Sequence, residues 1–96
     1  MIVDLVTFKV KQDRIAEFER HNEDWVHHMR RARGFVTQVM MRSLERPTEF
    51  TAEVRWVSRD YRDRFHSSED ADRRALQQKA REILESPPAS LLLECV

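Results

Sequence analysis

Four histidines and several aromatic residues are the side chains in this chain best suited to chemistry. His21 and His28 lie seven residues apart with Trp25 between them, so on a helix all three fall within one stripe. Two helical turns separate the imidazoles by about 10 Å, too far for them to bind one metal ion together. His27 points away from the stripe, and we expect it to be solvated. Imidazoles beside aromatic rings are typical of pockets in which a proton is moved.

Each of these histidines also has an ordinary structural interpretation. His21 and His28 can be boundary residues that form hydrogen bonds to neighbours such as Asp24. His66 follows a short polar segment, where a loop can either border a cavity or face solvent. The sequence leaves both alternatives open for all three residues.

Other residues could complete such a pocket. Its walls can be built from the aromatic residues Phe8, Phe18, Trp25, Trp56 and Phe65. Asp4 is a candidate base if it faces a helix layer, but we expect it to be a solvated residue at a strand end. Tyr61 could donate a hydrogen bond to a substrate oxygen or be an ordinary exposed tyrosine. We expect Cys95 to be a small, packed side chain.

Size, charge and absent motifs exclude several function classes. The 96 residues are enough for one domain with a modest core, and we expect a single domain over 1–96. The 17 basic and 17 acidic side chains balance, which argues against binding to nucleic acid or to anionic membranes. One cysteine excludes an internal disulfide, and no apolar run approaches the ~20 residues of a membrane span. Without a signal peptide at 1–10, a cytoplasmic location is expected.

The elements that must position these side chains follow from hydrophobic spacing and from turn residues. The pattern predicts a strand over 2–10, a helix over 14–33, strands over 35–44 and 49–57, a short helix from Ser58 to about His66, a longer helix from Ser67 or Ser68 to about Glu85, and a strand over 90–96. Asp13 and Ser58 are the expected N-caps of their helices, and Gly34 follows the end of the first helix.

The order βαββαβ predicts an α+β, ferredoxin-like fold with a four-stranded antiparallel sheet and helices on one face. The first strand is apolar on both faces, with Val3, Leu5 and Thr7 on one of them. An apolar sheet face that no helix covers needs a partner, so we expect a homodimer formed through sheet packing.

Several motifs resemble those of the antibiotic biosynthesis monooxygenase family of dimeric α/β barrels. They are Phe8-Lys9-Val10-Lys11, a helix with Phe18 that is followed by Gly34-Phe35-Val36, the junction Val54-Arg55-Trp56-Val57-Ser58-Arg59, and the closing Pro-Pro with its apolar final strand. The resemblance covers nearly the whole chain. It implies the fold more closely than the activity, since the family includes cofactor-free oxygenases of aromatic polyketides, haem-degrading enzymes and proteins of no known activity.

Two branches of that family can be compared with this chain by motif. The Asn, aromatic and haem-ligating His of the haem-degrading branch fall at Val6, Phe65 and Ala75, so the resemblance argues against haem degradation of that type. In the cofactor-free branch, the strand-end Trp corresponds to Trp56, and its Tyr and Arg lie near Tyr61 and near Arg73 or Arg74. The Asn of that branch is replaced here by Ala52.

These observations predict a homodimeric, cofactor-independent monooxygenase that oxidises an aromatic, phenolic or anthrone-like molecule with O2. Such a protein has to move a proton, exclude water and stabilise negative charge. The alternatives are a non-redox enzyme similar to polyketide cyclases, a haem-binding or haem-degrading protein, and a non-catalytic dimeric binding protein. The predicted catalytic residues are Trp56, His66 and Tyr61, and the predicted substrate-binding residues are Phe8, His21, Trp25, His28, Phe65 and Arg73. No metal ligands are predicted.

Overall fold

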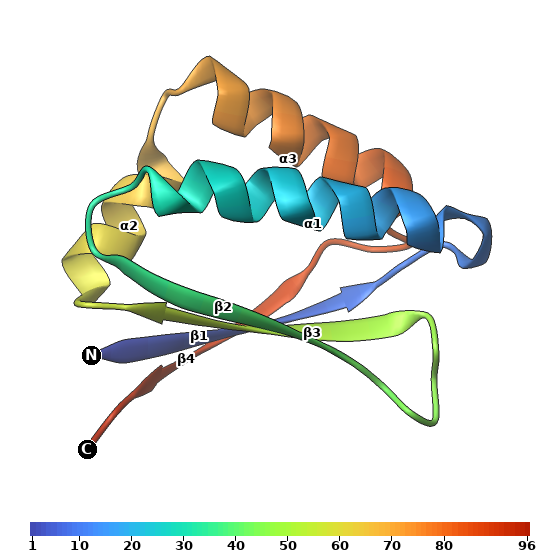
Figure 1. Ribbon diagram of the computed structural model, residues 1–96, viewed down its shortest axis with the longest axis horizontal. Coiled ribbons are helices and arrows are strands. Elements are labelled where there is room, and N and C mark those ends of the chain that lie inside the picture. The colour runs from blue at the N-terminus through green and yellow to red at the C-terminus, as the bar shows by residue number, and fades with distance from the viewer.

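The computed structural model describes residues 1–96 and places the helices on one face of a single sheet (Figure 1). The strands are β1 (Ile2–Lys9), β2 (Phe35–Arg42), β3 (Glu49–Trp56) and β4 (Ala89–Glu94). The helices are the 3-10 turn η1 (Gln12–Arg14), α1 (Ile15–Arg30), α2 (Arg59–Ser67) and α3 (Ala71–Ile83). The sheet is antiparallel with the order β2-β3-β1-β4, which confirms the predicted ferredoxin-like arrangement.

Strand β3 forms the centre of the core because its alternate residues all face the helices. These residues are Phe50, Ala52, Val54 and Trp56, and all four are buried. One group of core residues surrounds Phe50 beneath the start of α1 and the end of α3, and a second surrounds Trp56 beneath the end of α1 and α2. The intervening residues Thr51, Glu53 and Arg55 are only partly buried and lie on the opposite face of the sheet.

The first helix begins differently from the prediction. Asp13 lies inside the turn η1, and α1 starts at Ile15 with no side chain capping it. The 3-10 turn takes up the residues that follow β1, and the N-cap position falls on Arg14, so Asp13 lies one residue too early to serve as the N-cap. The cap predicted for α2 is confirmed, because the Ser58 hydroxyl accepts a hydrogen bond from the backbone N–H of Tyr61 at 3.5 Å.

Helix α3 is capped by Asp70, so the predicted start at Ser67 or Ser68 is wrong. The Asp70 carboxylate accepts hydrogen bonds from the N–H groups of Asp72 and Arg73, at 2.8 and 3.1 Å. The hydroxyl of Ser68 instead accepts a hydrogen bond from the N–H of Asp70, which fixes the loop before the helix. A carboxylate that satisfies two free N–H groups is the stronger cap at this end.

The chain enters β2 through Gly34, which has a φ of +88°. A Cβ at this position would lie 2.4 Å from Cβ of Tyr61 on α2. Gly34→Ala is therefore expected to lower the free energy of unfolding by about 2–4 kcal/mol, from left-handed backbone strain and the clash together. Urea denaturation measures this loss. In a Tyr61→Gly background the same substitution should cost roughly half as much, and an equal cost in both backgrounds would contradict the close contact.

The second face of the sheet carries no helix (Figure 1). Residues of β1 alternate, so Val3 and Leu5 lie on this outer face, where they pair with Leu93 and Leu91 of β4. The large apolar side chains exposed on the outer face are Val39, Met41, Leu91 and Leu93, each 43–58% exposed.

Two further findings concern the ends of the chain and its helices. Cys95 is exposed, contrary to the packed position predicted, because β4 ends at Glu94 and the cysteine lies beyond the last strand residue. None of the helices combines the length and the apolar character that crossing a membrane requires.

Candidate active site

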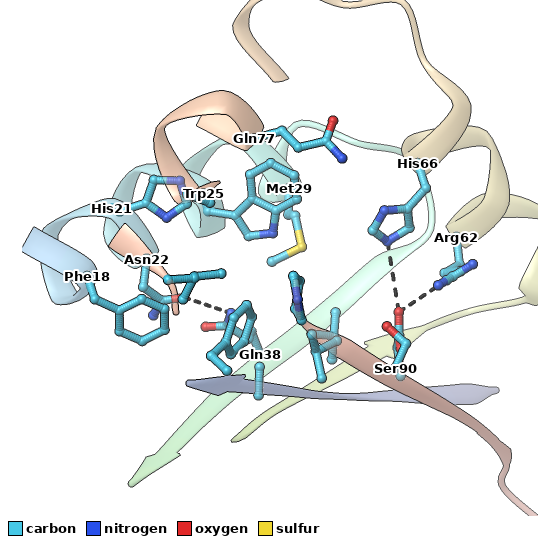
Figure 2. Close-up of a pocket in the computed structure, with 18 residues that line it drawn as sticks. Phe18, His21, Asn22, Trp25, Met29, Gln38, Arg62, His66, Gln77 and Ser90 are labelled. Atoms are coloured by element: carbon cyan, nitrogen blue, oxygen red, sulfur yellow. Dashed lines mark hydrogen bonds and ion pairs between the residues drawn. The ribbon is translucent and has the colours of Figure 1, made fainter. Parts of the chain in front are cut away.

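A cavity of about 220 Å³ lies between the inner face of the sheet and the helices (Figure 2). Val6 of β1 with Ala52 and Val54 of β3 form its apolar floor. Trp25 and Met29 of α1 line the opposite side, together with further residues of α1 and α3. Apolar and aromatic groups thus form two opposite walls of the cavity, as is common in sites that bind small organic molecules.

One end of the cavity is polar and is formed by Asp4 of β1 with Arg62 and His66 of α2 (Figure 2). The Arg62 Nε–H donates a hydrogen bond to Asp4 Oδ2 at 3.1 Å. Nε2 of His66 lies 3.9 Å from the same oxygen, within ion-pair range but beyond hydrogen-bond range. Arg62 and His66 are four residues apart, so one face of α2 presents both side chains to Asp4.

The position of Asp4 corrects the prediction of a solvated strand end. Its residue is 1% exposed, because β1 begins two residues earlier and Asp4 faces inward opposite Val54. Helix α2 then covers it, and the charge of Arg62 compensates the charge of its carboxylate.

His66 is held in its neutral form at neutral pH. Removal of much of its ring from water lowers the pKa of His66 below the usual 6.5, and the positive charge of Arg62 lowers it further, while Asp4 opposes both effects. Its side chain remains 38% exposed, so the ring can exchange a proton with solvent. A neutral imidazole that faces an apolar cavity and reaches water can act as a general base.

The other side of the cavity carries amide groups and a second histidine. Gln38 of β2 donates a hydrogen bond from Nε2 to Oδ1 of Asn22 on α1, at 2.9 Å. Nε2 of His21 lies 2.7 Å from the carbonyl oxygen of Leu76, which requires Nε2 to carry the proton and donate it. This bond joins α1 to α3 and fixes the ring of His21 at the cavity wall.

Phe65 links the cavity to the core behind it. Its ring centroid lies 5.4 Å from that of Trp56, 5.5 Å from that of Trp25 and 5.3 Å from that of His66. Trp56 has no exposed surface and is not among the residues that line the cavity. Trp56 and Phe65 therefore support Trp25 and His66 from behind.

The structure brings together four of the nine predicted site residues. Phe8, His21, Trp25 and His66 all line the cavity. Trp56 and Phe65 lie behind it, as described above. For His21 the two alternatives both apply, since the residue is hydrogen-bonded to a neighbouring helix and also lines the cavity.

The remaining three predicted residues lie elsewhere. Tyr61 and His28 line a second hollow of about 340 Å³ at the end of α1, a shallow basic surface together with Arg31, Arg33 and Arg64. Arg73 is buried and donates hydrogen bonds from Nε and Nη2 to the carbonyl oxygen of Ser68, at 3.2 and 2.7 Å. Arg73 thus fixes the α2–α3 loop, and it lines neither of these two cavities. The functional roles predicted for these residues stay predictions.

Asp4, expected at a solvated strand end, and Arg62 both line the cavity although neither was among the predicted site residues. The indication for Arg62 was its spacing of four residues from His66 on a short helix. The indication for Asp4 was a carboxylate within an otherwise apolar half of a strand. Nowhere in the chain do three His, Cys, Asp or Glu side chains gather closely enough to hold a metal ion.

Comparison with solved structures places this cavity in a known fold. An antibiotic biosynthesis monooxygenase from Caulobacter crescentus superposes with a TM-score of 0.88 at 19% identity, covering 99% of this chain and 89% of that one. A Bordetella bronchiseptica protein of the same description has a TM-score of 0.83 at 26% identity, covering 99% and 96%. A variant of SnoaB, a cofactor-independent oxygenase from Streptomyces nogalater, has a TM-score of 0.85 at 18% identity, covering 98% and 91%.

Comparison by sequence gives the family. No curated protein sequence matches this chain significantly. The family model for antibiotic biosynthesis monooxygenases matches residues 1–80, which include β1, β2, β3, α1, α2 and most of α3. This match supports a monooxygenase-like function and confirms the resemblance seen in the sequence motifs. Because the matched region covers most of the 96 residues, the protein belongs to the antibiotic biosynthesis monooxygenase family.

Proposed function

We propose that the protein is a cofactor-independent monooxygenase of an aromatic small molecule and acts as a homodimer in the cytoplasm. The observation that carries the proposal is the neutral imidazole of His66, which faces a cavity with aromatic walls. Family membership and the fold shared with a cofactor-independent oxygenase support it.

The reaction starts with a proton transfer. His66 accepts a proton from an activated C–H or from a phenolic O–H of the substrate, and the imidazolium that forms lies 3.9 Å from the Asp4 carboxylate, which stabilises it. The substrate anion is electron-rich and transfers electrons to O2. For a CH2 group of an anthrone, the product is a carbonyl: one atom of O2 enters it, and the other leaves as water with the two hydrogens.

The rest of the cavity binds the ring and excludes water. Trp25 and Phe8 provide apolar surface against which an aromatic ring can stack, and both belong to the group of apolar residues packed around Met29. Low polarity around the ring strengthens every charge interaction at the polar end, where Arg62 offers positive charge close to the developing anion. Trp56 and Phe65 contribute as positioning residues by packing behind Trp25 and His66.

Oxygen consumption tests the proposal. Purified protein is mixed with dithranol, an anthrone, in the presence of a chelator and without added cofactor. The proposal predicts saturable oxygen uptake with formation of a quinone. Uptake no faster than the buffer blank would contradict it, and product formation under strict anaerobiosis would indicate a non-redox, cyclase-like reaction instead.

The proposed dimer forms through the outer face of the sheet, where Leu91 and Leu93 lie uncovered. Glu53 and Arg55 also lie on this face. The Arg55 Nε lies 2.8 Å from Glu53 Oε1, so the two charges cancel and a second copy can pack there without net repulsion.

Leu91→Glu is expected to raise the dimer dissociation constant at least about tenfold, because it places a charge in an apolar interface. Sedimentation velocity measures the change. Leu44→Glu is the matched control, since Leu44 is fully exposed in the β2–β3 turn. A wild-type protein that sediments as a monomer at tens of micromolar would contradict the dimer, as would equal effects of the two substitutions.

A further inference from the structure

The two oxygens of the Asp4 carboxylate have different surroundings. Oδ2 accepts the hydrogen bond of Arg62 and faces His66. Oδ1 is buried and has no hydrogen-bond partner. Leaving a carboxylate oxygen buried and unpaired is costly, and most buried polar atoms in folded proteins have a partner. The stability of the fold therefore does not explain why Asp4 Oδ1 is buried without a partner.

The neighbours of Asp4 in the sheet cannot satisfy this oxygen. Asp4 lies between Val54 of β3 and Leu92 of β4, and neither side chain has a polar atom. Arg62 is engaged with Oδ2 and also donates from Nη1 to Asp63 at 3.1 Å. Asp4 borders the cavity, so a molecule bound there can supply the missing donor.

We propose that Asp4 Oδ1 accepts a hydrogen bond from an O–H or N–H group of the bound molecule, so that the cavity selects neutral aromatic molecules that carry such a donor. This inference rests on the proposed function, because it concerns the same cavity and narrows its substrate class to hydroxylated or amino-substituted aromatic rings. Asp4 thereby becomes a specificity residue, distinct from His66, which removes the proton.

Charge at this end of the cavity favours a neutral donor. The negative charge of Asp4 is compensated by Arg62 at 3.1 Å, so a ligand ammonium group would bring an additional, uncompensated charge into an apolar space. A ligand carboxylate placed at Oδ1 would meet a like charge and offers no proton to donate. A phenolic hydroxyl meets both requirements, because it is neutral and donates one hydrogen bond.

Asp4→Asn tests this role with little change of shape. Since Arg62 donates to Oδ2, the amide oxygen of Asn should take that position, which leaves the NH2 group in the place of Oδ1. The variant therefore presents a donor where the wild type presents an acceptor. Asp63→Asn is the matched control. Asp63 is the other carboxylate partner of Arg62, and Asp63 itself does not line the cavity.

The experiment compares 2-naphthol with 2-methoxynaphthalene, which has the same rings and no donor. Binding of each is measured by calorimetry under anaerobic conditions, so that no turnover interferes. The wild type should bind 2-naphthol at least about tenfold more tightly, as expected for a hydrogen bond to a charged acceptor. In Asp4→Asn the preference should fall to within about threefold, whereas Asp63→Asn should keep it.

Two outcomes of this binding experiment would reject the proposed role of Asp4. Equal affinity of the wild-type protein for the two probes would overturn the inference, even if Asp4→Asn failed to fold. A preference for 2-naphthol that survives in Asp4→Asn would also overturn it. Because binding is measured without oxygen, a clear preference without any oxygen uptake in the aerobic assay would support the role of Asp4 and reject the proposed oxygenase activity.

Discussion

His66→Ala is expected to lower kcat/KM for the aromatic substrate by roughly 100-fold, because it removes the general base that faces the cavity. The measurement is the initial rate of oxygen uptake at several substrate concentrations. His27→Ala is the matched control, since His27 is an exposed histidine on α1 that lines no part of this cavity. Equal rates for the two variants would show that no proton passes through His66.

The pH profile gives an independent check of the same residue. A base must be neutral to accept a proton, and the pKa of His66 lies below the usual 6.5. The value of kcat/KM should therefore rise with pH through that lowered pKa and become constant above about pH 7. His66→Gln should lose this rising limb. An activity that increases as the pH falls would assign His66 the role of an acid instead.

Trp56→Ala is expected to lower the free energy of unfolding by about 3–5 kcal/mol, because it empties the largest fully buried side chain in the core. Urea denaturation followed by circular dichroism measures this loss. The indole also leaves its Nε1–H without a hydrogen-bond partner, so Trp56→Phe, which removes that group, should cost much less. A loss below about 1 kcal/mol for Trp56→Ala would contradict its central place in the core.

The two Trp56 variants also separate packing from catalysis. Trp56 supports Phe65, whose ring in turn packs against His66. Trp56→Phe keeps an aromatic ring at this position, so its turnover should stay within about threefold of the wild type. A folded Trp56→Phe protein with turnover as low as that of His66→Ala would mean that the indole itself contacts the substrate.

The fold was largely predictable because its elements have strong local patterns. Apolar residues alternate with polar ones from Phe50 to Trp56, a pattern typical of a strand with one buried face, and Gly34 marks the end of the first helical segment. Helix starts were less predictable, since several polar residues near each start have side chains that could serve as the N-cap. At α3 the choice between Ser68 and Asp70 depends on which side chain meets two free N–H groups, and spacing along the sequence does not decide that.

The site was predictable only in part, because the residues that form it are determined by burial and by contacts between residues far apart in the sequence. Alternation puts Trp56 on the same face of its strand as Phe50 and Val54, but it does not show that Phe65 packs on Trp56 or that Trp25 packs on Phe65. The position of Asp4 depends on where β1 starts and on a contact with Arg62, 58 residues later in the chain. The cavity histidines His21 and His66 were identifiable because their residue type already indicates proton chemistry.

Isotopically labelled oxygen shows directly whether the protein transfers one atom of O2 to an aromatic substrate. The protein is incubated with dithranol under 18O2 in ordinary water, with a chelator and no cofactor, and the quinone is analysed at once by mass spectrometry. A monooxygenase reaction at this cavity should give one labelled oxygen atom per product molecule, formed at a rate that depends on His66. A product without the label, or formed equally fast by His66→Ala, would contradict a monooxygenase reaction at this cavity.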